Sequence, residues 1–249
     1  MLYLRQRTEI AGSFSPARKR GQTPTALVSM AHHMSSPLCA WSRLLALWLV
    51  LGAGFSIFGE TVFNPQGGEY SVVGALPGDQ VYPHVAIGRA GGFVVWQDNF
   101  TDEEGLGISA QRLDSSLTPL FGRFRINQQG AGDQERPKVA LLADGGAVFV
   151  WQGGSKLDQD IQARFLTASG TFATDDVRVN TFTAGIQQDA AVAALRDGGA
   201  VVVWSSWDQD GNLQGVYGQL FAASGQKRGG EFRVNQFTQF NQRNAAVAG

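Results

Sequence analysis

Three acid-rich turns hold the side chains whose types and spacing come closest to a chemical site. In one of them Asp208, Asp210 and Asn212 alternate, as the oxygen ligands do at the start of a calcium-binding loop. The bidentate Glu expected at the twelfth loop position is missing, because Gln219 stands there. Asp, Asn and Gly also favour ordinary turns. We therefore expect solvated turns and keep calcium as the less favoured alternative. The three turns are DNFTDEEG from Asp98, KLDQD from Lys156 and WDQDGN from Trp207.

The chain contains few residues suited to nucleophilic catalysis. The one cysteine, Cys39, lies near the N-terminus, and His84 is the one histidine after residue 59. His84 occupies a repeat position that we assign to Lys138 and Asp189 in later copies, which argues against a catalytic role. No phosphate loop, dinucleotide fingerprint or zinc spacing occurs. We predict no catalytic, cofactor-binding or metal-binding residues. A glycosidase with paired carboxylates stays open, because Asp and Glu are plentiful.

The charges divide the chain into two regions. Residues 1–59 carry a formal charge of +5, whereas residues 60–249 carry −6. Nucleic-acid binding needs a basic face that displaces counterions. We therefore expect no nucleic-acid partner.

A sixteen-residue segment without charges, LLALWLVLGAGFSIFG, runs over 44–59 and follows Arg43. This pattern is typical of a secretory signal peptide, with cleavage after Gly54 favoured over cleavage after Gly59. As a helix it would rise about 24 Å, which is short of a ~30 Å hydrocarbon core. A signal peptide over 34–59 is therefore favoured over a membrane anchor or a buried helix. Either of the first two places the protein outside the cytoplasm or in the cell envelope.

The residues before this leader are polar and basic. We interpret 1–33 as a disordered tail or as an extension upstream of the true start at Met30 or Met34. An organelle transit peptide is a minor alternative.

Residues 60–249 contain an internal repeat of about 54 residues. The copies share a VA-containing segment, a Gly-Gly turn, an apolar run that ends in Trp, and an FRVN-like segment. We expect three repeats and the opening of a fourth, at about 68–121, 122–174, 175–229 and 230–249. The chain therefore has the character of a fragment of a longer array. The equivalent positions include Trp96, Trp151 and Trp204, then Gln80, Gln134, Gln187 and Gln242, then Asn127, Asn180 and Asn235.

Each repeat predicts four short strands, in the order FRVN-like, VA-containing, Trp-ending and IQARF-like. The Gly-Gly turns, as in Asp144-Gly145-Gly146, indicate tight hairpins in which consecutive residues take positive φ. The uninterrupted apolar run AVFVW indicates burial on both faces of a sheet. We interpret its Trp as a core residue; the alternative, a platform that stacks on sugars, would require an exposed Trp.

This pattern predicts an all-β fold of tandem four-stranded, propeller-like blades, a partial array preceded by an N-terminal hydrophobic helix. A sandwich of repeated hairpins or an open stack of small sheets would give a similar pattern. Propellers have about four to eight blades, and the end blades of a three-repeat stack would leave apolar faces in water. We therefore expect further repeats or self-association to cover them.

The motifs PKVALLADGGAVFVW, AQRL and GEFRVN, across about 68–249, resemble the Trp-containing tandem repeats of large exported bacterial surface proteins. The resemblance implies no catalytic residues. The first copy departs from it, because Arg89 and Ala90 replace the Asp of the turn. The segment from Ser206 begins like the Asp-box of sialidases, but Asp210 stands at the Gly position and the Thr and Trp are missing.

These observations favour an exported, non-catalytic scaffold at the cell surface or outside the cell, and not an enzyme. Its variable turns, at 98–105, 153–160 and 205–214, would bind a surface ligand, either a glycan or a protein. The alternative is an N-terminal fragment of a propeller-type carbohydrate-active enzyme. A remnant with no function of its own is a third possibility.

Overall fold

The computed structural model describes residues 71–102 and 104–249 of the protein. The predicted extension 1–33, the leader 34–59 and its hydrophobic helix lie outside these residues. The described part contains strands and turns but no helix, and hence no helical segment able to cross a bilayer.

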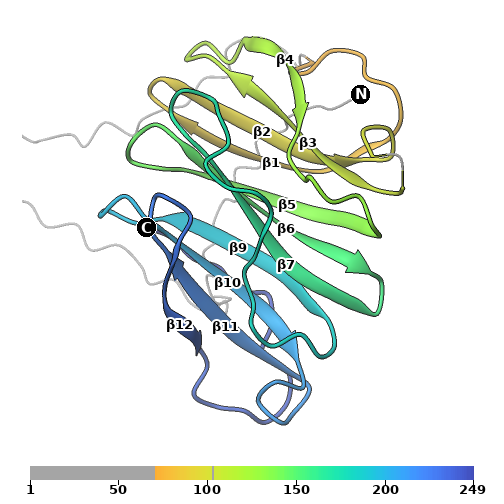
Figure 1. Ribbon diagram of the computed structural model, residues 1–249, viewed down its shortest axis with the longest axis vertical. Helices are drawn as coiled ribbons and strands as arrows, with labels where there is room; N and C mark the ends of the chain where they lie inside the picture. The colour runs from red at the N-terminus through yellow and green to blue at the C-terminus, as the bar shows by residue number, and fades with distance from the viewer. Residues whose placement is uncertain (1–70, 103) are drawn as a thin grey trace, which may run out of the picture. The chain divides into compact units, whose positions relative to one another are not determined.

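In the described residues twelve strands form three four-stranded antiparallel sheets, one for each repeat (Figure 1). In sheets 1 and 2 the strand order follows the sequence, β1-β2-β3-β4 and β5-β6-β7-β8, and sheet 3 has the same adjacency among β9 to β12. The predicted all-β fold of tandem four-stranded units is confirmed. The strands are β1 Gln80–Gly88, β2 Gly91–Asp98, β3 Gly107–Leu113, β4 Pro119–Arg125, β5 Asp133–Leu141, β6 Ala147–Ser155, β7 Asp158–Leu166, β8 Val177–Arg178, β9 Gln187–Ala194, β10 Ala200–Trp207, β11 Gln214–Phe221 and β12 Lys227–Arg233.

The FRVN-like segment lies at the opposite end of the sheet from the one expected. We predicted it as the first strand of each unit, but β4 pairs with β3 and β12 with β11, so it is the last strand of the preceding unit. The repeat length is unaffected. The physical reason is the short connection between these strands, which favours antiparallel pairing with the strand just before.

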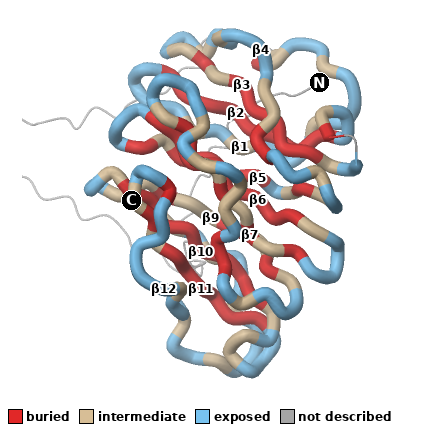
Figure 2. The backbone as a smooth tube through the Cα atoms, viewed as in Figure 1, coloured by how far each residue is buried: buried red, intermediate tan, exposed pale blue. Residues whose placement is uncertain are grey.

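The second strand of each sheet is buried on both faces, as predicted (Figure 2). Trp96, Trp151 and Trp204 are fully buried, which confirms their role in the core. The indole nitrogen of Trp151 donates to Gln134 Oε1 at 2.8 Å, and that of Trp204 donates to Gln187 Oε1 at 3.1 Å. In sheets 2 and 3 the repeated Gln thus satisfies the one polar atom of the buried Trp.

The Gly-Gly hairpins differ in detail from the expected pair of positive φ values. At the turn between β5 and β6, Gly145 has a φ of 88°, whereas Gly146 does not take a positive φ. Gly146 is required for space, since a Cβ there would lie 2.4 Å from the carbonyl oxygen of Leu166. Asp144 completes the turn by accepting the Gly146 N–H at 2.8 Å.

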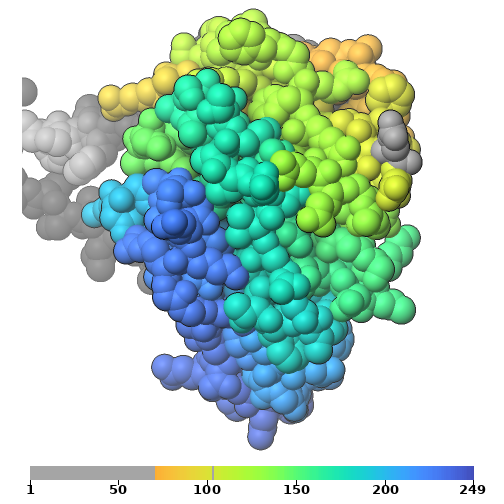
Figure 3. Space-filling model, in the orientation of Figure 1, coloured from red at the N-terminus to blue at the C-terminus, as the bar shows by residue number. Residues whose placement is uncertain are grey.

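The three sheets pack face to face in sequence order. The first strand of each sheet contacts the preceding sheet: β5 lies against β1, β2 and β3, and β9 lies against β5, β6 and β7. Figure 3 shows the same order, with colours running from yellow through green to blue. Apolar clusters fill both interfaces, around Phe149 and Trp151 in one and around Phe165 and Trp204 in the other. This is the propeller-like stacking predicted from the repeats.

A fourth segment continues the pattern after sheet 3. The Gln242 N–H donates to the Gln214 carbonyl at 2.8 Å, and Ala245 and Val247 pack on a cluster that includes Val201 and Val203. It covers part of the apolar face of sheet 3 in the way that β5 and β9 cover the sheets before them.

Candidate functional site

Every first strand carries a bulge at the same repeat position, opposite the buried Trp. In sheet 1 the register shifts between Val81 and His84, so that two residues oppose the single Trp96 of β2. The same shift occurs opposite Trp151 in sheet 2 and opposite Trp204 in sheet 3. Bulges of this kind turn a side chain away from the direction that the strand would give it.

The leading residue of each bulge takes a backbone conformation that L-residues rarely adopt. We call these residues the bulge cluster: Tyr82, Arg136, Asp189 and, in the fourth segment, Asn244. Their φ angles are 52°, 52°, 54° and 59°. Such conformations cost about 1–3 kcal/mol for residues other than Gly and are concentrated at functional sites. The same unusual backbone conformation occurs at one position in four successive copies of the repeat. This makes the bulge cluster the strongest candidate site in the described residues.

The bulges are held by hydrogen bonds between neighbouring sheets. The Arg136 N–H donates to Gln97 Oε1 of sheet 1 at 2.8 Å. The Asp189 N–H donates to Gln152 Oε1 of sheet 2 at 3.3 Å. In the fourth segment the Asn244 N–H donates to Ser205 Oγ of sheet 3 at 3.2 Å. The acceptor is in each case the residue that follows the buried Trp, so each sheet fixes the bulge of the next one.

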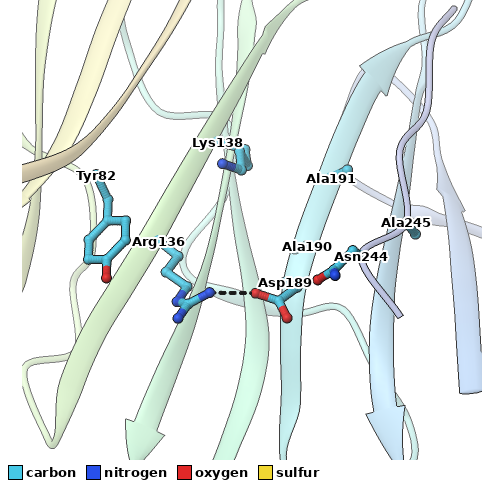
Figure 4. Close-up of a pocket in the computed structure, with 8 residues that line it drawn as sticks. All are labelled: Tyr82, Arg136, Lys138, Asp189, Ala190, Ala191, Asn244 and Ala245. Atoms are coloured by element: carbon cyan, nitrogen blue, oxygen red, sulfur yellow. Dashed lines mark hydrogen bonds and ion pairs between the residues drawn. The ribbon is translucent and has the colours of Figure 1, made fainter. Parts of the chain in front are cut away.

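The bulge cluster lines a pocket of about 240 Å³ where the first strands come together (Figure 4). Arg136 Nη1 donates to Asp189 Oδ1 at 2.6 Å. On its other side the Arg136 guanidinium lies 5.4 Å from the ring centre of Tyr82. Tyr82 is 54% exposed, so part of this residue remains accessible to a ligand. The pocket thus brings an aromatic ring, an ion pair and the amide of Asn244 to one place.

Two further ionisable groups lie beside the cluster. Burial and the adjacent charge of Arg136 lower the pKa of Lys138, partly offset by Asp189. Burial, followed by the charge of Lys138, lowers the pKa of His84 to about 4. His84 is therefore neutral at pH 7, and its Nδ1 accepts the Val139 N–H at 3.3 Å.

The acid-rich turns do not contribute to this pocket. Their carboxylates instead bind an Asn that follows the last strand of the same sheet. Asn180 Oδ1 accepts the Ile161 N–H at 2.8 Å, while its Nδ2 donates to Asp160 Oδ1 at 2.5 Å. Asn127 with Asp102 and Asn235 with Asp210 repeat this arrangement. Asp210 is thus engaged with Asn235. In the described part of the chain no three metal-ligating acidic, His or Cys side chains cluster to hold an ion.

The sequence did not lead us to the bulge cluster. The structure also corrects one expected equivalence between repeats. Asp189 is equivalent to Tyr82 and not to His84. The residues equivalent to His84 are Lys138 and Ala191. One signal was present in the sequence. Two residues after each repeated Gln, the copies carry Tyr, Arg, Asp and Asn in turn, whereas a Val-Ala pair recurs three and four residues further on.

The fold and the pocket define the class of this protein: a β-propeller-like array with a polar pocket at the junction of its first strands. The chain matches no known family model and no curated protein. Among solved structures it is similar to the endo-arabinase from Bacteroides thetaiotaomicron, with a TM-score of 0.42 and 14% identity over 61% of this chain and 54% of the other.

Two further solved structures match to a similar degree. An α-L-arabinofuranosidase from Lactobacillus brevis has a TM-score of 0.41 and 12% identity over 62% of this chain and 53% of the other. A GH62 hydrolase in complex with xylotriose has a TM-score of 0.39 and 13% identity over 64% and 52%. The matches extend over about half the length of each of these chains.

These comparisons correct two expectations from the sequence. We expected a non-catalytic scaffold that is not an enzyme, but the solved structures that match are glycoside hydrolases. The alternative, an N-terminal fragment of a propeller-type carbohydrate-active enzyme, is taken up as a proposal below. We sought function in the variable turns, whereas the bulge-cluster pocket is lined mainly by the first strands β1, β5 and β9. The resemblance to exported surface repeats holds for the propeller-like fold alone.

Proposed function

We propose that this protein is a propeller-type carbohydrate-active protein and that its bulge-cluster pocket binds the sugar. The observation that carries the proposal is the bulge cluster itself: four different polar or aromatic side chains held in the same rare conformation at one repeat position. The backbone conformation repeats while the side chain at this position varies, as expected for a site in which each repeat contributes a different contact.

The chemistry of the pocket suits a saccharide. Sugars present apolar faces of C–H groups and a rim of hydroxyls, so they need an accessible ring and polar groups that donate and accept hydrogen bonds. Tyr82 supplies the ring, which also carries a polar hydroxyl. Asn244 offers both a donor and an acceptor, Asp189 accepts and Arg136 donates. A pocket with a few convergent polar groups is typical of small-molecule sites.

Asp189 is the carboxylate that lines the pocket in the described residues. Hydrolysis of a glycosidic bond by two carboxylates requires a second one about 5–9.5 Å away. We assign to Asp189 the role of orienting sugar hydroxyls, and of acting in hydrolysis if a second carboxylate is supplied to the site.

The test is a calorimetric titration of the full chain with arabino- and xylo-oligosaccharides. We expect Tyr82→Ala to weaken binding at least about tenfold, because a well-packed aromatic contact contributes about 1.5 kcal/mol or more. Phe237→Ala is the matched control, since Phe237 is similarly exposed but lies outside the pocket. An equal loss in both variants, or no binding to any oligosaccharide in a broad panel, would contradict the proposal.

A second measurement concerns hydrolysis. If the protein releases reducing sugar from the same substrates, this release should fall in Asp189→Asn and persist in Asp158→Asn, whose side chain is exposed outside the pocket. Asn fits the bulge because the next repeat carries Asn244 at the same position with the same φ. If neither variant alters a measurable activity, Asp189 has no part in catalysis.

Export remains part of this proposal and rests on Arg43 and the apolar segment 44–59. Sequencing the N-terminus of the protein recovered outside the cytoplasm is the test. A mature N-terminus within 1–30 would contradict it.

A further inference from the structure

Lys138 is a cation that lines the pocket and forms no ion pair within the described residues. It lies on β5 two residues after Arg136 and lines the same pocket (Figure 4). Its side chain is half-buried, and among the described residues it has no ion pair and no hydrogen bond. Because this unpaired ammonium lines the pocket, it is available to an anionic group on a bound ligand.

The charged groups around Lys138 do not neutralise it. Asp189 is 2.6 Å from the Arg136 guanidinium and is therefore already paired. His84 is neutral, since its pKa is lowered to about 4. The pocket therefore carries two cations and one anion, although residues 60–249 carry a net charge of −6. A ligand with one negative charge would balance this pocket.

We propose, on the basis of the proposed function, that the sugar bound here is a uronic acid whose carboxylate pairs with the Lys138 ammonium. Tyr82 provides the face for the sugar ring, while Asp189 and Asn244 are available for its hydroxyls. A single carboxylate matches the single uncompensated charge, whereas a phosphate would exceed it.

The lowered pKa of Lys138 fits this arrangement. Burial and the charge of Arg136 both disfavour the ammonium form. An anion placed beside it would reverse these effects and would itself be bound more tightly in a pocket partly shielded from water.

The experiment uses calorimetric titration of the full chain with trisaccharides of galacturonate, glucuronate, mannuronate and guluronate. Each is compared with its own methyl ester, which keeps the sugar and removes the charge. At least one acid should bind about 10- to 100-fold more tightly than its ester, the range expected for a charge-assisted hydrogen bond. The preference should shrink as salt is added.

Three variants separate the role of the charge from that of the fold. Lys138→Gln should abolish the preference while leaving the affinity for the ester unchanged. Lys138→Arg should retain it. Lys156→Gln should behave as the parent protein, because Lys156 is exposed and lies outside the pocket. Ester binding by each variant shows that its pocket is folded.

Each result decides between outcomes. If acids and esters bind equally, or if a sulfated trisaccharide binds more tightly than every acid, the carboxylate inference is wrong while the proposed carbohydrate function stands. If no acid, ester or neutral oligosaccharide binds, both fail. If acetate alone binds at Lys138 and no saccharide does, the site is an anion site and the uronate inference is overturned.

Discussion

Replacing Gln97 with Met tests whether one sheet shapes the binding pocket of the next. Gln97 is 3% exposed, and its Oε1 accepts the Arg136 N–H at 2.8 Å. Met has nearly the same length but no comparable acceptor. A donor left without its partner costs about 1–3 kcal/mol, which is comparable to the cost of holding Arg136 at a positive φ. Once the hydrogen bond is lost, the bulge residue is free to leave its present conformation.

Two measurements follow from this reasoning. Urea unfolding, monitored by the fluorescence of the buried Trp residues, should show a loss of about 1–3 kcal/mol in the free energy of unfolding. Sugar affinity should fall about 5- to 30-fold, which corresponds to about 1–2 kcal/mol. Gln97 does not line the pocket, so it acts as a positioning residue.

The matched control is Gln111→Met. Gln111 is buried in the same sheet and donates to the carbonyls of Arg112 and Leu120, both at 2.9 Å. This variant should lose a similar amount of stability but keep its sugar affinity. If Gln97→Met loses stability while its affinity is unchanged, or if both variants lose affinity equally, the bulge is not what sets the geometry of the pocket.

Three further predictions concern the structural residues. Trp151→Ala should lower the free energy of unfolding by about 3–5 kcal/mol in urea titrations, because it removes a fully buried side chain and the bond to Gln134; a loss below 1 kcal/mol would contradict its place in the core. Asn180→Asp should place a carboxylate beside Asp160, so its loss of stability should grow as pH rises from 4 to 8, whereas a constant deficit would argue against this contact. For His84 the folded-state pKa of about 4 lies below the unfolded value of 6.5, so the unfolded state binds the proton first. Stability should be complete above pH 6.5 and fall by about 1–2 kcal/mol towards pH 4, allowing for partial exposure; a flat profile that His84→Gln does not change would refute this.

The repeat-level features of the fold could be predicted because they depend on patterns that recur within the chain. An uninterrupted apolar run requires two buried faces, and this placed Trp96, Trp151 and Trp204 in the core. The order of the strands within each sheet was harder to predict from the sequence. The FRVN-like segment alternates in polarity as a strand does, but alternation does not say which neighbour it pairs with.

The bulge cluster was beyond sequence reasoning for a physical reason. Gly or Asn in a sequence usually indicates a residue with positive φ, yet Tyr82 and Arg136 adopt a positive φ here. Their conformation depends on contacts from the neighbouring sheet, and Gln97 lies 39 residues away from Arg136 in the sequence. Local propensity contains no information about such a partner. The repeated Gln and Asn were visible as repeats, but their hydrogen bonds to Trp151 and to Ile161 were not.

The hydrogen bonds from Gln97, Gln152 and Ser205 have a consequence for how such arrays can diversify. The preceding sheet holds the backbone of Arg136, Asp189 and Asn244 in place. A repeat moved on its own would therefore lose the hydrogen-bond acceptor that positions its pocket residue. Recombination that preserves sugar binding must therefore cut the chain within a repeat. The acceptor in one sheet and the bulge residue of the next sheet then stay together.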